Sequence, residues 1–227
     1  MLNQTLLPRE IILWLSKEQF PSAEDVPMSL RKLEGEIFKI RFVDGDIRSH
    51  KKYYYVAKDF PNDYVFLIDD DTYYASTLLH RTWEEHLKHP EAVICNYGYR
   101  MSYKTDGHID NYNSWAECYE YSAEKNLFFG SGGGTLFRPI DLYKDLTNLD
   151  KAIELTPTAD DIWLNAMTRL AGRNIVIMPN GLPLEFHSGE RTLTIINKDE
   201  AGNDKQLYAI ECFYNNEGKV VFNEQII

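Results

Sequence analysis

The chain has 227 residues, of which 44% are apolar and 26% are charged, which is typical of a globular protein with one sizeable domain. This composition excludes a disordered, collagen-like or coiled-coil chain. The 24 Lys and Arg residues are outnumbered by 35 Asp and Glu residues, so the formal net charge is −11. Because such a chain repels a phosphate backbone over most of its surface, we expect no nucleic-acid partner.

The cysteine usage and the hydropathy pattern predict a cytoplasmic protein. Cys95, Cys118 and Cys212 are widely spaced, odd in number and not part of a C-x-x-C motif. They are therefore expected to be free thiols in a reducing compartment, not disulfide or zinc ligands. No window approaches the run of about 20 apolar residues that crosses a bilayer. The first ten residues have neither the basic flank nor the apolar core of a signal peptide.

Short apolar runs alternate with helical patterns, which predicts an α/β fold in one domain. The expected strands are residues 10–16, 37–43, 64–68, 92–96, 135–137 and 173–178. The expected helices are residues 27–35, 49–60, 76–89, 158–171 and 203–214, with Ser76 and Gly172 as caps. Residues 10–16 (EIILWLS) are continuously apolar, as in a strand buried on both faces. Residues 98–126 predict long loops or short antiparallel strands.

An acidic triplet, Asp69, Asp70 and Asp71, follows the apolar strand YVFLI directly. In an extended chain residues i and i+2 point to the same side, so Asp69 and Asp71 are expected to project together at the carboxyl end of the strand. Open α/β sheets bind their ligands at that edge. Two converging carboxylates suit a hard divalent cation that also binds phosphate oxygens. The alternative is an exposed acidic turn that caps the next helix.

A second acidic pair, Asp160 and Asp161, lies at the start of the clearest predicted helix. Thr158 followed three residues later by Asp161 fits a capping box, and carboxylates suit a helix N-terminus. Alternatively, one of the two carboxylates is a general base that deprotonates an acceptor hydroxyl. The pattern favours neither interpretation over the other.

Three further segments are candidates for ligand binding. His187, in the segment EFHSG, is either structural or a nitrogen ligand that favours Mn²⁺ over Mg²⁺. Residues 48–53 (RSHKKY) form a basic turn at a helix start, which suits a diphosphate or is a solvated helix end. Residues 130–134 (GSGGG) allow close backbone approach to a ligand or form a bulged loop. They do not form a P-loop, and no G-x-G-x-x-G follows a strand.

The ordered set of these segments resembles bacterial GT-A-type glycosyltransferases, close to the family 2-like enzymes of capsule and lipopolysaccharide synthesis. The matching pieces are NQTLLPREIILWLSKEQFP, HKKYYY, YVFLIDDDTYY, GSGGGTLF, ADDIWL and EFHSG, up to about residue 190. The resemblance implies a single GT-A-like domain over residues 1–227 with a mixed, mostly parallel sheet flanked by helices. Within it, residues 1–98 would form the nucleotide-sugar-binding half, residues 99–190 the acceptor side, and residues 191–227 a C-terminal helix and tail.

The resemblance also implies roles for individual residues in an inverting, metal-assisted transfer. Asp71, Asp69 and His187 would hold Mn²⁺ or Mg²⁺, and Asp161 would be the base, with Asp160 as its substitute. The residues implied for donor binding are Asp69, Asp70, His50, Lys51 and Lys52. Those implied for the acceptor are Gly132, Gly133, Gly134 and Trp115. The implied partners are a UDP- or GDP-linked sugar and a saccharide acceptor, with peripheral association with the inner membrane through a lipid-linked acceptor.

One departure from the family pattern concerns the start of the chain. The resembling enzymes begin with a strand that carries Ser or Thr and Arg residues and helps to hold the nucleotide base. That strand is followed by a helix whose end reads like residues 2–5 (LNQT). We therefore expect either a truncated sequence or a replacement for the strand. Two other functions stay open: an inactive domain that binds a carbohydrate or a partner, and a metal-dependent phosphohydrolase.

Overall fold

The computed structural model describes residues 1–178, the strand at residues 185–186, and residues 202–222. The strands are β1 (Ile11–Ser16), β2 (Phe38–Val43), β3 (Val65–Ile68), β4 (Thr72–Tyr73), β5 (Ala92–Cys95), β6 (Gly98–Arg100), β7 (Ala116–Cys118), β8 (Leu127–Phe129), β9 (Gly133–Phe137), β10 (Asn174–Ile177) and β11 (Glu185–Phe186). The α-helices are α1 (Met28–Arg31), α2 (Lys51–Asp59), α3 (Leu78–Lys88), α4 (Leu149–Leu155), α5 (Asp160–Leu170) and α7 (Gly202–Asn216). Short 3-10 helices cover Ala23–Asp25, Arg48–His50, Tyr112–Ser114 and Pro139–Asp141. The α/β class predicted from the alternating pattern is confirmed.

The largest sheet has the strand order β10-β5-β9-β3 and is mixed. Strands β5 and β10 are parallel, whereas β9 runs antiparallel to both β3 and β5. A parallel pair needs a crossover connection, usually a helix, and the chain from β6 to β9 contains no α-helix. This explains why β9 runs opposite to its neighbours and why the sheet is mixed. The short antiparallel strands expected within residues 98–126 are present as β6 and β7, which form a second sheet with β8.

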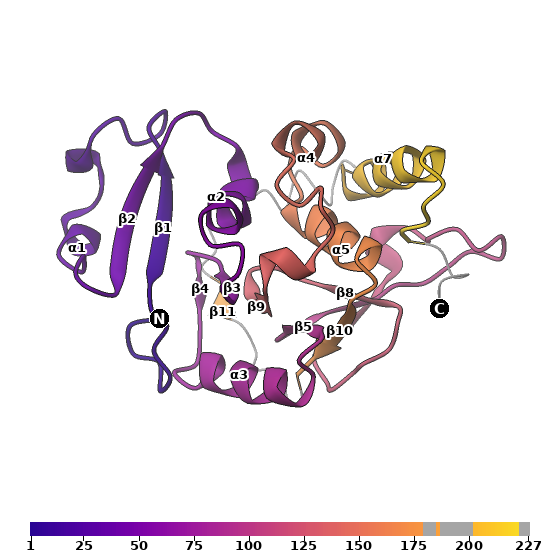
Figure 1. The fold of residues 1–227 in the computed structure, drawn as a ribbon, viewed down its shortest axis with the longest axis horizontal. Coiled ribbons are helices and arrows are strands. Elements are labelled where there is room, and N and C mark those ends of the chain that lie inside the picture. The colour runs from indigo at the N-terminus through magenta and orange to yellow at the C-terminus, as the bar shows by residue number, and fades with distance from the viewer. Residues whose placement is uncertain (179–184, 187–201, 223–227) are drawn as a thin grey trace.

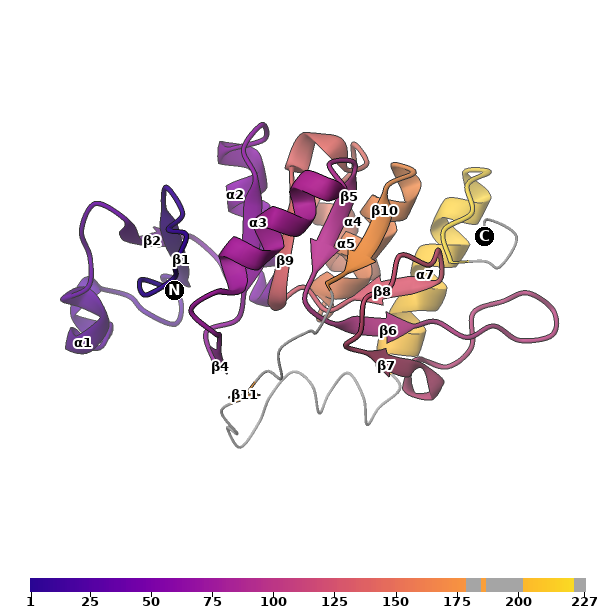
Figure 2. The same ribbon diagram turned by 90° about the horizontal axis from the view of Figure 1, so that it is seen from below.

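Helices cover both faces of the central sheet. Helix α3 lies on one face, and α2 and α5 lie on the other (Figure 1). The core beneath α5 includes the fully buried Trp163 and Phe128, and α7 contributes Ile210 and Tyr214 to the same core. The view from below shows α3 crossing the sheet and α7 beside the sheet of β6, β7 and β8 (Figure 2). The packing therefore links the C-terminal helix to the middle of the chain.

Strands β1 and β2 form a separate parallel pair that does not join the central sheet. They lie apart from β3 in Figure 1. The five apolar residues of β1 are only half-buried, so the expectation that this run is buried on both faces is wrong. The reason is a groove of about 580 Å³ between β1 and β3, which both strands line.

Several helix boundaries differ from the predicted ones. Helix α1 is a single turn, and α3 begins after Thr77, so Ser76 does not cap it. Helix α5 begins after Ala159, and the capping box that was one of the two interpretations of Thr158 and Asp161 is not formed. Gly172 does end α5 as expected, with a φ of 68° in the left-handed region. Within the described part of the chain, no helix is long and apolar enough to span a bilayer.

Candidate functional site

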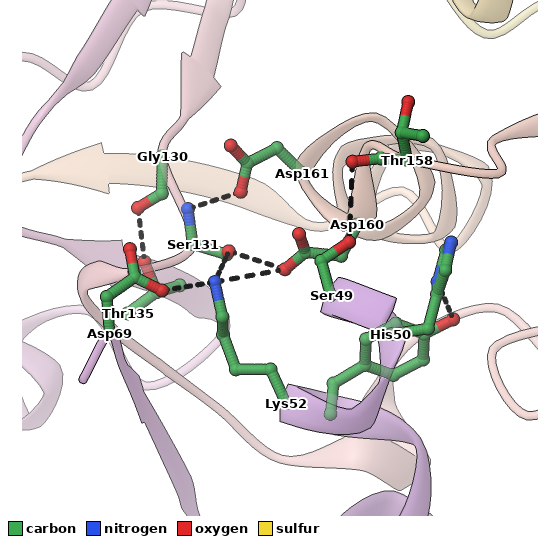
Figure 3. A network of polar contacts seen from close by, with 12 residues as sticks. Ser49, His50, Lys52, Asp69, Gly130, Ser131, Thr135, Thr158, Asp160 and Asp161 are labelled. Carbon is green, nitrogen blue, oxygen red and sulfur yellow. Dashed lines mark hydrogen bonds and ion pairs between the residues drawn. The ribbon is translucent and has the colours of Figure 1, made fainter. Parts of the chain in front are cut away.

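Four segments that are far apart in the sequence meet at one polar site. Asp69 follows the end of β3, and Lys52 lies in the first turn of α2. Ser131 lies in the turn between β8 and β9, and the pair Asp160 and Asp161 begins α5. Their side chains point toward one another in Figure 3. The two acidic groups that the sequence singled out thus share a site.

Lys52 is the centre of this arrangement. Its Nζ lies 2.5 Å from Oδ1 of Asp69 and 3.4 Å from Oδ2 of Asp160. The same ammonium donates to Oγ of Ser131 at 3.3 Å. Although burial lowers the pKa of Lys52, the charges of Asp160, Asp69 and Asp161 raise it well above its usual value. Lys52 therefore carries a permanent positive charge between the two acidic groups.

Ser131 connects the β8–β9 turn to the start of α5. Its Oγ donates to Oδ2 of Asp160 at 2.8 Å, and its backbone N–H donates to Oδ1 of Asp161 at 2.7 Å. The side chain of Asp161 thus accepts from a distant backbone group and does not form a capping box with Thr158. Asn165, one turn later, clamps the helix to β8 through both backbone groups of Phe129.

The glycines of the turn allow the chain to approach Asp69 closely. A Cβ at Gly132 would lie 1.7 Å from Oδ2 of Asp69, so only glycine fits there. The backbone N–H of Asp69 donates to the hydroxyl of Tyr74 at 2.7 Å, and that hydroxyl donates to the carbonyl of Gly132. Asp69 is therefore held in place from the strand end and from the glycine turn.

The two adjacent carboxylates of α5 have opposite acid–base properties. Burial, followed by the neighbouring charge of Asp160, raises the pKa of Asp161 to about 7. Burial also acts to raise the pKa of Asp160, but the charge of Lys52 and the hydrogen bond from Ser131 lower it below its usual value. At neutral pH Asp160 is consequently ionised, while Asp161 is poised to exchange a proton. This separation is typical of paired carboxylates with different roles.

His50 and Lys51, predicted to bind the donor, are committed to contacts within the chain. His50 is fully buried, with Nδ1 3.0 Å from the hydroxyl of Tyr53 and Nε2 2.6 Å from the carbonyl oxygen of Thr156. Burial lowers the pKa of His50, so the ring is neutral. Lys51 is paired with Asp46. The prediction that His50 contacts a diphosphate directly is therefore wrong. Its ring instead connects the start of α2 to the chain just before α5.

Asp70 and Asp71 are exposed beyond the end of β3. Burial raises the pKa of Asp69, and the neighbouring Lys52 acts to lower it. The charges of Asp160 and Asp71 raise it further, and the net pKa is above its usual value. Two interacting carboxylates fit Mg²⁺ or Mn²⁺ that takes its other ligands from water and substrate phosphate. The described residues contain no group of three or more His, Cys, Asp and Glu side chains that would hold a metal ion by themselves.

The residues predicted to border the acceptor are dispersed. Gly133 and Gly134 are buried within β9, and a Cβ at Gly134 would meet Leu78 and Phe66, on the side of α3. Trp115 is buried against Tyr112 and Phe128. Only Gly132 of this set contacts the polar site. His187 lies outside the described residues.

Two members of the site were not predicted. Ser131 was read only as part of a glycine-rich loop, although a serine inside a glycine cluster is a donor that the backbone can bring close to an anion. Tyr97 packs against Gly130, where a Cβ would lie 2.6 Å from the hydroxyl oxygen of Tyr97. Burial raises the pKa of Tyr97, and the charge of Asp161 raises it further. The tyrosine-rich pattern of residues 97–121 was the available signal for it.

Comparison with known proteins does not extend this description. No protein-family model matches the chain, and no curated protein matches it. The function must therefore be argued from the site itself.

Proposed function

We propose that this chain is a GT-A-type glycosyltransferase that moves a sugar from a UDP- or GDP-linked donor to a saccharide acceptor on the cytoplasmic side of the membrane. The observation that carries the proposal is the convergence of Asp69, Lys52 and Asp161 at one site. These residues come from three separate elements, and all belong to segments that resemble such enzymes. The finer GT-A assignment rests on the order of those segments along the chain.

Asp161 is the general base of the proposed reaction. A base is most effective when its pKa lies near the working pH, and the pKa of Asp161 is about 7. It removes the proton of an acceptor hydroxyl while that oxygen forms a bond to the anomeric carbon. The bond from that carbon to the diphosphate breaks on the opposite face, and its electron pair leaves with the diphosphate. The sugar is transferred with inversion.

Lys52 and Asp160 set the electrostatics around that base. Lys52 supplies a fixed positive charge beside the donor-side acid Asp69, at 2.5 Å. A cation in this position stabilises negative charge that develops on a leaving phosphate. Asp160 stays ionised and binds Lys52 and Ser131, so it keeps both oriented. Asp69 and Asp71 would hold a Mg²⁺ or Mn²⁺ ion, which supplies further charge neutralisation at the diphosphate when bound.

The decisive experiment compares the wild type with Asp161→Asn on a panel of UDP-, GDP- and CMP-linked sugars with Mn²⁺ and saccharide acceptors. Loss of a general base is expected to lower the transfer rate by about 10²–10⁴-fold. Affinity for the nucleoside diphosphate, measured by calorimetry, is expected to stay within about twofold. Equal transfer rates for the two proteins, or release of sugar phosphate without any acceptor, would contradict the proposal; the latter result would indicate a phosphohydrolase.

One observation favours a second candidate, an inactive domain that only binds a carbohydrate or a partner. Lys52 already neutralises Asp69, so the acid that resembles a metal ligand has a cation beside it. A domain of this kind would bind nucleoside diphosphates with the same affinity with and without Mn²⁺. A glycosyltransferase would bind them more tightly with the ion, and the same calorimetry separates the two.

A further inference from the structure

Three tyrosines, Tyr119, Tyr97 and Tyr99, form a row beside the acids of the polar site, called here the tyrosine row. The rings of Tyr97 and Tyr119 are stacked, with centroids 5.8 Å apart and planes inclined by 17°. The ring of Tyr99 lies edge-on to that of Tyr97, at 6.3 Å. The pairing of β6 with β7 explains the stack. Gly98 lies opposite Cys118, so the neighbouring Tyr97 and Tyr119 face each other on one side of the sheet.

The tyrosine row leads from the surface to the proposed base. Tyr119 is 39% exposed, and Tyr97 is half-buried. The hydroxyl end of Tyr97 lies against Gly130, where a Cβ would come within 2.6 Å of the hydroxyl oxygen. Gly130 directly precedes Ser131, whose backbone N–H donates to Oδ1 of Asp161 (Figure 3). The row therefore ends one residue from the group that binds Asp161.

The chemistry of the row suits a sugar ring. A tyrosine ring presents an apolar, negatively polarised face and carries a hydroxyl at its edge. A sugar ring has C–H groups on one face and hydroxyl groups around its edge, so it stacks on the aromatic face and forms hydrogen bonds beside it. Glu117 lies on the same side of the sheet and accepts from the hydroxyl of Tyr119 at 3.3 Å. Its carboxylate is thus placed to accept from a sugar hydroxyl as well.

The charges around the row distinguish between classes of sugar. In β6, β7 and β8, as the structure describes them, the positions on the side of the row include Glu117 and no Lys or Arg. Arg100 points to the opposite side of the sheet and pairs with Glu124 at 3.2 Å. Lys52 already pairs with two carboxylates. A sugar that carries a carboxylate or a phosphate would therefore meet like charges at Glu117 and Asp161.

We propose that the tyrosine row binds the acceptor and that it takes an uncharged sugar ring and rejects acidic ones. The ring stacks at the exposed end of the row, on Tyr119 and Tyr97, and its reacting hydroxyl is directed to Asp161. This inference rests on the proposed function, in which Asp161 is the base. The row takes the place of Trp115, which is buried. A nucleotide base also stacks on aromatic rings, but its phosphates need cations, which the row does not carry.

The test measures saccharide binding by the full chain without any donor or metal ion. The probes are an array of neutral oligosaccharides of glucose, galactose, mannose and N-acetylglucosamine, together with their uronic-acid and phosphorylated counterparts. We expect binding of at least one neutral oligosaccharide, and binding of its acidic counterparts that is weaker by about tenfold or more. The neutral oligosaccharide that binds most tightly is then titrated by NMR to give its dissociation constant.

Variants of Tyr119 test whether this binding depends on the row. Tyr119→Ala removes the ring and is expected to weaken binding by about fivefold or more, whereas Tyr119→Phe keeps the ring and should stay within about twofold. The matched control is Tyr64→Ala. Tyr64 is similarly exposed, at 41%, but it precedes β3, at the end of that strand opposite to Asp69. It should bind as the wild type does. Far-UV circular dichroism checks the fold of each variant, and Tyr119→Leu replaces Tyr119→Ala if the latter does not fold.

Four results would overturn this proposal. They are no binding of any neutral oligosaccharide, equal binding of acidic ones, equal affinities of Tyr119→Ala and Tyr64→Ala, and a loss of affinity for UDP or GDP in Tyr119→Ala, which would assign the row to the nucleotide base.

The failure of this inference is distinguishable from the failure of the proposed function. Binding of a saccharide at the row without transfer from any donor would contradict the proposed function alone. Transfer by the wild type and by Tyr119→Ala with the same KM for the acceptor would contradict the tyrosine row alone.

Discussion

Removing the charge of Lys52 is the sharpest perturbation of the polar site. The variant Lys52→Met keeps most of the side-chain volume but leaves Asp69 and Asp160 without their shared cation. Loss of one partner of a buried ion pair costs about 3–5 kcal/mol. The side chains of Lys52 and Asp69 are 20% and 33% exposed, so the pair is partly solvated. We therefore expect a loss of about 2–3 kcal/mol in the free energy of unfolding at pH 8.

Thermal and urea unfolding at two pH values measure this effect. For a chain of this size the loss corresponds to a fall in Tm of about 4–12 °C. At pH 5 the loss is expected to be smaller, because carboxylates without a cation take up protons. The control is Lys17→Met, which removes the exposed ion pair with Asp44 and should cost less than about 1 kcal/mol. Equal losses for the two variants at both pH values would refute the network around Lys52.

Three further predictions concern the acids and glycines of the site. Asp161 has a pKa of about 7, above its ordinary 3.8, so its contribution to stability is full below about pH 4 and is lost progressively as the pH rises to 7. Asp161→Asn should therefore gain more stability relative to the wild type at pH 8 than at pH 5, as urea unfolding at both pH values will show. Gly132→Ala places a Cβ 1.7 Å from Asp69, so it should lower the free energy of unfolding by about 1–3 kcal/mol, and adding Lys52→Met to it should then cost almost nothing more. The control is Gly172→Ala, where the space is open and φ is 68°. It should cost about 1 kcal/mol and leave the effect of Lys52→Met unchanged. Asp71→Asn, at an exposed position, should change the free energy of unfolding by less than about 0.5 kcal/mol but remove any dependence of nucleoside-diphosphate affinity on Mn²⁺, which calorimetry with and without the ion will test.

Apolar runs and strand-end acids were the parts of the fold that sequence patterns predicted well. The run at residues 64–68 became β3, and Asp69 lies where an acid after a buried strand is expected to lie. The strand prediction succeeds because a short apolar run between polar turn residues is a local signal of a buried strand.

Interpretations that depended on neighbouring residues do not hold where a distant group competes. Thr158 and Asp161 have the spacing of a capping box, yet Asp161 accepts from the backbone of Ser131, which is 30 residues away. His50 lies in a basic turn typical of phosphate binding, but its ring is buried and bonded to Thr156, 106 residues away. Neither contact follows from spacing along the chain, because each depends on how α2, α5 and the glycine turn pack together.

The antiparallel insertion of β9 was also beyond the sequence pattern. A strand of five residues with two glycines gives no signal of its direction or its neighbours. Its position between β3 and β5 nevertheless determines the site, because it brings the turn that carries Ser131 beside Asp69. Residue types therefore indicated the chemistry of this site, and the topology decided which residues share it.

Helix α2 connects the polar site with the groove between β1 and β3. Lys52 and Val56 are four residues apart and lie on the same face of the helix, and both border the groove. Lys52 also holds Asp69 and Asp160, so any rotation or shift of α2 changes the distances within the site. Since Asp161 owes part of its pKa to the opposing charge of Lys52, the position of α2 also sets how readily that acid gives up its proton. The groove and the acidic site therefore share helix α2, and a change in the packing of this helix affects both.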